Sequence, residues 1–185
     1  MKKTDVFIDL EGLGISFSLG TSAALTKFIA HRLPPALEKE GYLVSDVTGF
    51  ACYKRTMGIV PPSTQKSLRK EFASHGWRMI WSDCIADTAL IREVDAGLSS
   101  DTLAESVLLI ANDHDFIGIL DRINASGRES LVCGPNMSRK LPKHARKAFS
   151  LWELLGETFK IVPSECGPAS PPVNTPFDKI KLPGL

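Results

Sequence analysis

Cysteine and long apolar runs are both scarce in this sequence. The chain has four cysteines without a C-x-x-C pair, which argues against a zinc–thiolate site and a disulfide framework. The longest unbroken apolar stretch, residues 107–111, is far shorter than the ~20 residues of a membrane-spanning helix. The apolar run that begins at Val6 ends at Asp9, too early for a secretory signal. We therefore expect a cytoplasmic protein that makes no membrane contact.

A large excess of one charge is also missing. The 22 Lys and Arg residues against 21 Asp and Glu residues give a net charge of +1, which excludes a globally basic nucleic-acid-binding protein but permits a local basic patch. Hydrophobic residues at 43% and charged residues at 23% are typical of a folded protein. We expect one domain at residues 1–160, followed by a proline-rich tail at 161–185.

Short apolar segments alternate with helical patterns along the expected domain. The expected strands are residues 6–8, 43–53, 77–81, 107–111 and 130–133. The expected helices are residues 23–40, 61–75, 89–105 and 113–127. This alternation predicts a three-layer α/β/α fold with a central, mainly parallel sheet of about five strands. Gly12 and Gly14 predict a loop after the first strand, and Pro34 with Pro35 predicts a break in the first helix.

Acidic side chains follow the expected strands at the edge where open parallel sheets bind ligands. Asp9 ends the first strand, Asp113 and Asp115 follow the fourth, and Asp95 lies on the helix leading into it. If these carboxylates converge, their repulsion calls for a hard divalent cation, Mg²⁺ or Mn²⁺. Taken one by one, Asp9 also fits a turn, Asp113 a helix N-cap, and Asp95 an ion pair with Arg92.

Several segments resemble one protein family when they are taken in order. They are VFID at residues 6–9, REVD at 92–95, LLIANDHDF at 108–116, GR at 127–128 and SLVCG at 130–134. Their order and spacing are similar to those of the NYN domains of the PIN-like nuclease superfamily, LabA-like branch. The resemblance covers residues 4–155 and implies a parallel-sheet fold with metal-dependent endoribonuclease activity. It also places Asp9, Asp95, Asp113 and Asp115 in the family's catalytic, metal-binding cluster.

Further residues take second rank beside this cluster. They are Glu11, Arg92, Asp101, Asn112 and His114. The chain departs from the family pattern at Gly12, where an asparagine is usual, and at Asn112 and His114. These departures favour, as an alternative, a catalytically degenerate domain that binds RNA or a protein. His114 lies between two candidate ligands, where an imidazole can contact phosphate or transfer a proton.

A basic segment follows the fifth expected strand. Its candidate RNA-binding residues are Arg139, Lys140, Lys143, Arg146 and Lys147. A solvated helix face is the simpler interpretation. The resemblance places this segment near the carboxyl edge of the sheet, where it would hold the phosphates of single-stranded RNA.

The sequence therefore predicts a Mg²⁺- or Mn²⁺-dependent ribonuclease that hydrolyses RNA phosphodiester bonds and leaves a 5′-phosphate. A homodimer is compatible with the sequence. A third candidate is a haloacid-dehalogenase-like phosphatase. In this chain, DLEG at residues 9–12 and NDHD at 112–115 loosely resemble the acidic motifs of that family. That family needs a second aspartate at position 11, where this chain has Glu11.

Overall fold

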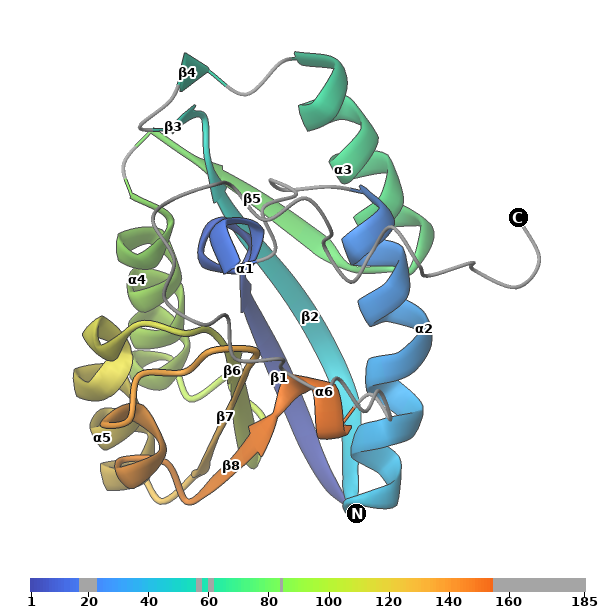
Figure 1. Ribbon diagram of the computed structural model, residues 1–185. Helices are drawn as coiled ribbons and strands as arrows, with labels where there is room; N and C mark the ends of the chain where they lie inside the picture. Colours follow the sequence, from blue (N-terminus) through green and yellow to red (C-terminus); the bar gives the residue numbers. More distant parts are fainter. Residues whose placement is uncertain (17–22, 56–57, 60–61, 84, 155–185) are drawn as a thin grey trace, which may run out of the picture.

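The computed structural model describes residues 1–16, 23–55, 58–59, 62–83 and 85–154 (Figure 1). The domain boundary expected at residue 160 and the tail at 161–185 lie outside these residues. Within the described ranges, no helix has both the length and the apolar character that crossing a membrane requires.

A six-stranded, all-parallel sheet forms the middle layer, with strand order β5-β2-β1-β6-β7-β8. Its strands are β1 (Lys2–Asp9), β2 (Tyr42–Cys52), β5 (Arg78–Ser82), β6 (Ser106–Ile110), β7 (Glu129–Gly134) and β8 (Lys147–Ser150). A separate antiparallel ribbon pairs β3 (Lys54–Arg55) with β4 (Gly58–Ile59). All five expected strands are present, and β8 is an addition to them.

Helices cover both faces of the sheet, which gives the predicted three-layer α/β/α arrangement (Figure 1). One face carries α1 (Leu10–Ser16), α2 (Ala23–Lys39), α3 (Pro62–Ser74) and α6 (Leu151–Leu154). The other face carries α4 (Ala86–Ser99), the 3₁₀ turn η1 (His114–Phe116) and α5 (Ile117–Ala125). A second 3₁₀ turn, η2 (Leu141–Lys143), precedes β8.

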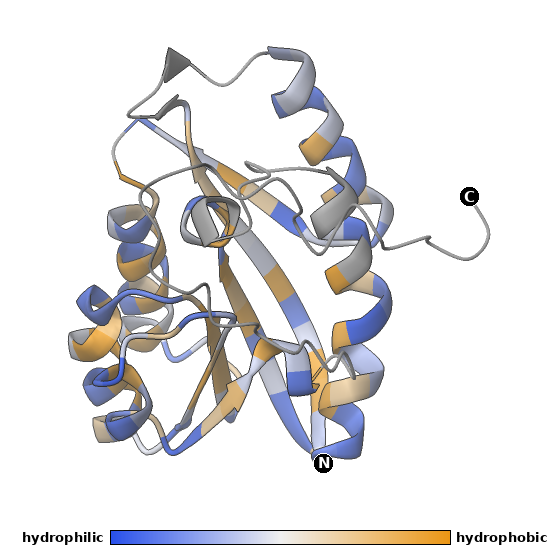
Figure 2. Ribbon diagram, in the orientation of Figure 1, coloured by the Kyte–Doolittle hydropathy of each residue, from blue (hydrophilic) through white to orange (hydrophobic). Residues whose placement is uncertain are grey.

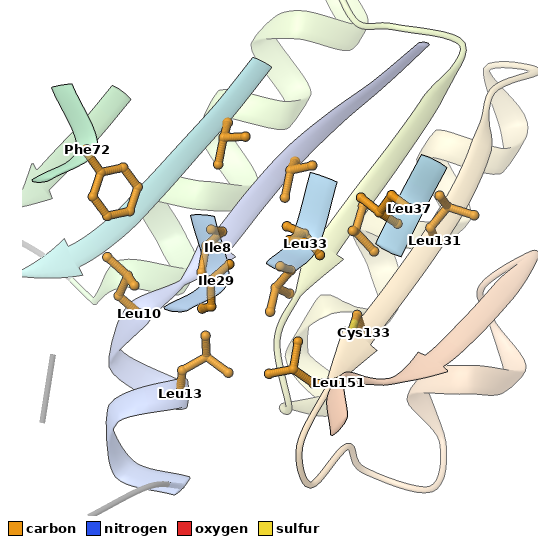
Figure 3. Close-up of a cluster of buried hydrophobic side chains, with 14 of the residues drawn as sticks. Ile8, Leu10, Leu13, Ile29, Leu33, Leu37, Phe72, Leu131, Cys133 and Leu151 are labelled. Atoms are coloured by element: carbon orange, nitrogen blue, oxygen red, sulfur yellow. The ribbon is translucent and has the colours of Figure 1, made fainter. Parts of the chain in front are cut away.

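Alternation along β1 divides the core into two clusters. Val6 and Ile8 pack under α1 and α2, whereas Phe7 packs under α4 and α5. Figure 3 shows the first cluster, in which Leu33 and Leu37 of α2 lie over the sheet. Every residue of β6 is buried, as expected for a central parallel strand covered on both faces. In Figure 2, helix α2 is orange on the side that faces the sheet and blue on its outer side.

The basic segment after β7 does not form the helix that the simpler interpretation of its charges assumes. It forms only the turn η2 and then the edge strand β8, which pairs with β7 from Leu131 to Gly134. Strand β8 is short and partly polar, and none of its four residues, Lys147–Ser150, is fully buried. A strand of this kind carries no clear apolar alternation, because it lies at the edge of the sheet.

Two local predictions in the first third of the chain are wrong. Residues after Asp9 form helix α1 rather than a loop, because Leu10 and Leu13 are buried three residues apart on one helical face. Helix α2 continues through Pro34 and Pro35 instead of breaking. Ile29, Leu33 and Leu37 of α2 are fully buried against the sheet, and this packing offsets the cost of the two internal prolines, roughly 3 kcal/mol each.

Candidate functional site

The carboxyl edge of the sheet brings three acidic segments together. Strand β1 ends at Asp9, helix α4 places Asp87 in its first turn, and the chain leaving β6 carries Asp113 and Asp115. The negative charge of Asp87 raises the pKa of Asp9, and the negative charges of Asp113 and Asp115 raise the pKa of Asp87. The structure thus brings Asp9, Asp113 and Asp115 to one edge, as the sequence predicts. We call Asp9, Glu11, Asp87, Asp113 and Asp115 the acidic cluster.

Asp9 is the buried member of the acidic cluster, with 3% of its surface exposed. Its Oδ1 accepts hydrogen bonds from the backbone N–H groups of Glu11 at 3.1 Å and Gly12 at 3.0 Å. These bonds make Asp9 the N-cap of α1. Burial raises the pKa of Asp9 to about 7; the Gly12 bond opposes this, while the charges of Asp87 and Glu11 add to it.

Gly12 is required by the position of the Asp9 side chain. A Cβ at residue 12 would overlap Asp9 Oδ2. A larger residue would therefore displace the Asp9 carboxylate. The departure from the family pattern at Gly12 fits the conformation that Asp9 adopts in this chain.

Asp87 is a member of the acidic cluster that sequence reasoning missed. The predicted helix began at residue 89, so Asp87 fell in a loop; the structure starts α4 at Ala86. Burial raises the pKa of Asp87 to about 6, and the charges of Asp113, Glu11 and Asp115 contribute to the increase. The available signal was an aspartate shortly after the third strand, where a parallel sheet presents its ligand-binding edge.

Asp113, His114 and Asp115 form an exposed group beside the buried carboxylates. Asp113 Oδ1 accepts from the backbone N–H of Asp115 at 3.4 Å, so Asp113 is the expected helix N-cap, here of η1. His114 Nδ1 lies 2.8 Å from Asp113 Oδ1, and its Nε2 lies 3.5 Å from Asp115 Oδ1. One ligand atom from each residue lies within 4.8 Å of the others, which is close enough to share a metal ion.

Two second-rank residues lie at the same edge. Glu11 is in the first turn of α1, and its negative charge raises the pKa of both Asp9 and Asp87. Asn112 Oδ1 accepts from the backbone N–H of Asn136 at 3.1 Å, and its carbonyl accepts from the N–H of Ser138 at 2.8 Å. Asn112 therefore holds the chain after β7 against the segment that carries Asp113.

The structure does not bring Asp95 to the acidic cluster. Its carboxylate accepts two hydrogen bonds from Arg122 of α5, at 2.8 and 3.0 Å. Asp95 follows Asp87 by eight residues on α4, which corresponds to about 12 Å along a helix. The ion-pair partner of Asp95 is thus Arg122 rather than Arg92, which is exposed on α4.

Asp101 lies at the opposite, amino edge of the sheet. It has a φ of 55° in the connection from α4 to β6, and it pairs with Arg128 Nη2 at 2.6 Å. A concavity of about 690 Å³ is found at this edge, with Lys2, Arg128, Glu129 and Arg146 in its wall. Lys2 pairs with Glu129 at 2.9 Å. The wall of the concavity thus carries charges of both signs, whereas the acidic cluster carries negative charges alone.

The predicted RNA-binding residues divide between the two edges of the sheet. Arg139 and Lys140 are exposed and follow β7 at its carboxyl end, and Lys143 is exposed in η2. Arg146 and Lys147 stand where β8 begins, at the amino edge. The expectation that all of them lie near the carboxyl edge is therefore wrong, because β8 is parallel to β7, so the chain returns to the amino edge before β8 begins.

Lys147 has a structural environment of its own. Its Nζ pairs with Glu40 at 2.8 Å and lies 5.3 Å and 4.9 Å from the ring centroids of Tyr42 and Phe149. These contacts tie β8 to β2 and to the end of α2. Lys147 thus supports the sheet edge.

Comparisons with known proteins complete the description. No protein-family model matches the chain, and no curated protein matches it. Among solved structures, an isochorismatase-like hydrolase from Alkaliphilus metalliredigens aligns with a TM-score of 0.44 and 9% identity, over 84% of this chain and 98% of that chain. A likeness of this size carries no argument about activity.

Proposed function

We propose that this protein is a divalent-cation-dependent ribonuclease that hydrolyses phosphodiester bonds of single-stranded RNA. The observation that carries the proposal is the acidic cluster, in which the charges of Asp113 and Asp115 raise the pKa of Asp87, and the charge of Asp87 raises the pKa of the buried Asp9. The resemblance of residues 4–155 to NYN domains supports the choice of substrate.

The acidic cluster fits a hard cation by the chemistry of its donors. Its side-chain donors are all carboxylate oxygens, which Mg²⁺ and Mn²⁺ prefer. Asp9 and Asp87 have pKa values raised to about 7 and about 6 through burial and acidic neighbours. A cation relieves this repulsion and keeps both groups ionised at neutral pH. The described cysteines, Cys52 and Cys133, are buried.

The residues at this edge have two different roles in such a reaction. Asp9, Asp87, Asp113 and Asp115 would hold the cation, which would activate a water molecule and neutralise charge on the phosphate. Arg139 and Lys140, exposed beyond β7, contact the RNA backbone. The product carries a 5′-phosphate.

A cleavage assay tests this proposal. Purified protein is incubated with fluorescently labelled single-stranded RNA in Mn²⁺, in Mg²⁺ and in EDTA, beside the Asp113→Asn variant. We expect cleavage that needs the cation and is lost in the variant. Binding of RNA without cleavage would instead support a degenerate RNA-binding domain. Hydrolysis of an aryl phosphate without cleavage of RNA would support the phosphatase.

A further inference from the structure

His114 is not itself acidic, but it lies between two members of the acidic cluster, Asp113 and Asp115. It is the central residue of the sequence Asp113-His114-Asp115, and each ring nitrogen faces a different carboxylate. The side chains of all three residues are more than half exposed, so a solvent ion can reach them. Since both aspartates belong to the acidic cluster, the imidazole lies beside carboxylates that would hold the proposed cation.

The two nitrogens of His114 differ in the contacts they make. Nδ1 lies 2.8 Å from Asp113 Oδ1, a normal distance for a hydrogen bond to a carboxylate. When Nδ1 carries the proton, the lone pair is on Nε2, and Asp113 orients the ring. A carboxylate that orients a histidine in this way is a common partner of metal-binding imidazoles.

The second contact has the spacing of two ligands on one ion. His114 Nε2 and Asp115 Oδ1 are 3.5 Å apart, the limit of a hydrogen bond. Two donor atoms that each bind one cation at about 2.1 Å lie roughly 3.0–3.4 Å from each other in octahedral or tetrahedral geometry. The observed separation is close to this range.

We propose that His114 binds the cation through Nε2, oriented by Asp113, and makes the site selective for a transition metal such as Mn²⁺ over Mg²⁺. This inference rests on the proposed function, since it concerns the same site. Imidazole nitrogen is a poor ligand for the hard Mg²⁺ and a good one for first-row transition metals. A purely carboxylate site lacks this means of discrimination.

Calorimetric titration with Mn²⁺ and with Mg²⁺ tests the proposal on the full chain and on His114→Ala. His144→Ala is the matched control, because His144 Nδ1 pairs with Asp121 at 3.0 Å on α5, outside the acidic cluster. We expect His114→Ala to weaken Mn²⁺ binding by about tenfold or more and Mg²⁺ binding by less than about twofold. Broadening of the His114 imidazole NMR signals by substoichiometric Mn²⁺ is the second readout.

The outcomes separate this inference from the proposed function. Equal losses for the two cations, no loss for either, or the same loss in His144→Ala would overturn the role of His114. If cation-dependent RNA cleavage persists in that case, the proposed function stands without the inference. If the unsubstituted protein binds neither cation, both are overturned.

Discussion

Asp87 and Asp95 lie on the same helix, yet their carboxylates have opposite electrostatic surroundings. Asp87 faces three acidic neighbours, and burial together with their charges raises its pKa to about 6. Asp95 accepts two hydrogen bonds from Arg122, so its charge is already compensated. A cation adds favourable interaction energy at Asp87 and little at Asp95.

Substitution of these two residues tests that distinction. We expect Asp87→Asn to lower the rate of RNA cleavage by at least roughly ten- to a hundredfold, as loss of a group that supports a metal does. Asp95→Asn should stay within about twofold of the unsubstituted protein, because an exposed ion pair contributes at most about 1 kcal/mol. Both variants should keep the same far-ultraviolet circular dichroism. A larger loss of activity in Asp95→Asn than in Asp87→Asn would show that Asp95, rather than Asp87, is a catalytic residue.

The raised pKa of Asp9 predicts how stability depends on pH. Its folded-state pKa of about 7 lies above the ordinary value of 3.8, so the folded protein binds more protons between these two values. Stability therefore falls as the pH rises from about 4 to about 7. The group destabilises the folded protein most above pH 7, where its carboxylate is charged and buried.

Asp9→Asn removes this titration and keeps an oxygen for the two backbone donors. Without divalent cations, we expect the variant to be more stable than the unsubstituted protein at pH 8, by up to about 4 kcal/mol. The difference should become small near pH 4 and vanish below it, where Asp9 is neutral in the folded and the unfolded chain. Urea denaturation in EDTA across this pH range measures it. A difference in stability that stays the same at every pH would contradict the raised pKa of Asp9.

At the scale of elements, helix α1 and the acidic cluster depend on each other. Asp9 caps α1 through the backbone N–H groups of Glu11 and Gly12, and the helix start holds the carboxylate in place. A Cβ at residue 12 would meet that carboxylate. Gly118, in the first turn of α5, differs, since a Cβ there would meet only Arg122 Nη1 at 3.5 Å.

Gly12→Ala and Gly118→Ala should therefore have opposite effects. Alanine is the better helix former by about 1 kcal/mol, so Gly118→Ala should raise the melting temperature slightly. Gly12→Ala should lower it, and should also weaken Mn²⁺ binding, because Asp9 must move. Thermal unfolding and calorimetry measure both effects. A stabilising Gly12→Ala would show that Asp9 readily takes another position.

At the scale of the whole molecule, the two edges of the sheet separate the basic residues. Arg139 follows the carboxyl end of β7, whereas Arg146 lies at the amino edge. The six residues of β7 span about 20 Å, which separates the two arginines. We expect the double variant Arg139→Ala, Lys140→Ala to raise the Kd for single-stranded RNA and to lower the salt slope by about one per lost phosphate contact. Arg146→Ala should leave both quantities unchanged. Fluorescence anisotropy at several salt concentrations checks this, and equal effects would place RNA across both edges.

Much of the architecture follows from local patterns in the sequence. The buried strand β6 and its neighbours were predicted, because their apolar runs and the intervening helical spacings are strong local signals. The positions of Asp9, Asp113 and Asp115 at one edge follow from the same reasoning, since parallel strands end on the same side. Helix α1 and strand β8 were missed, because glycines mask the first and the second is a short edge strand.

By itself, the sequence determined the layer arrangement and the edge at which most of the carboxylates gather. Only the tertiary structure decided which carboxylates face one another. Asp87 joins the acidic cluster and Asp95 pairs with Arg122 because the axial position of α4 against β1 and α5 depends on packing between distant segments. Charge compensation acts through space, so local sequence patterns do not encode it.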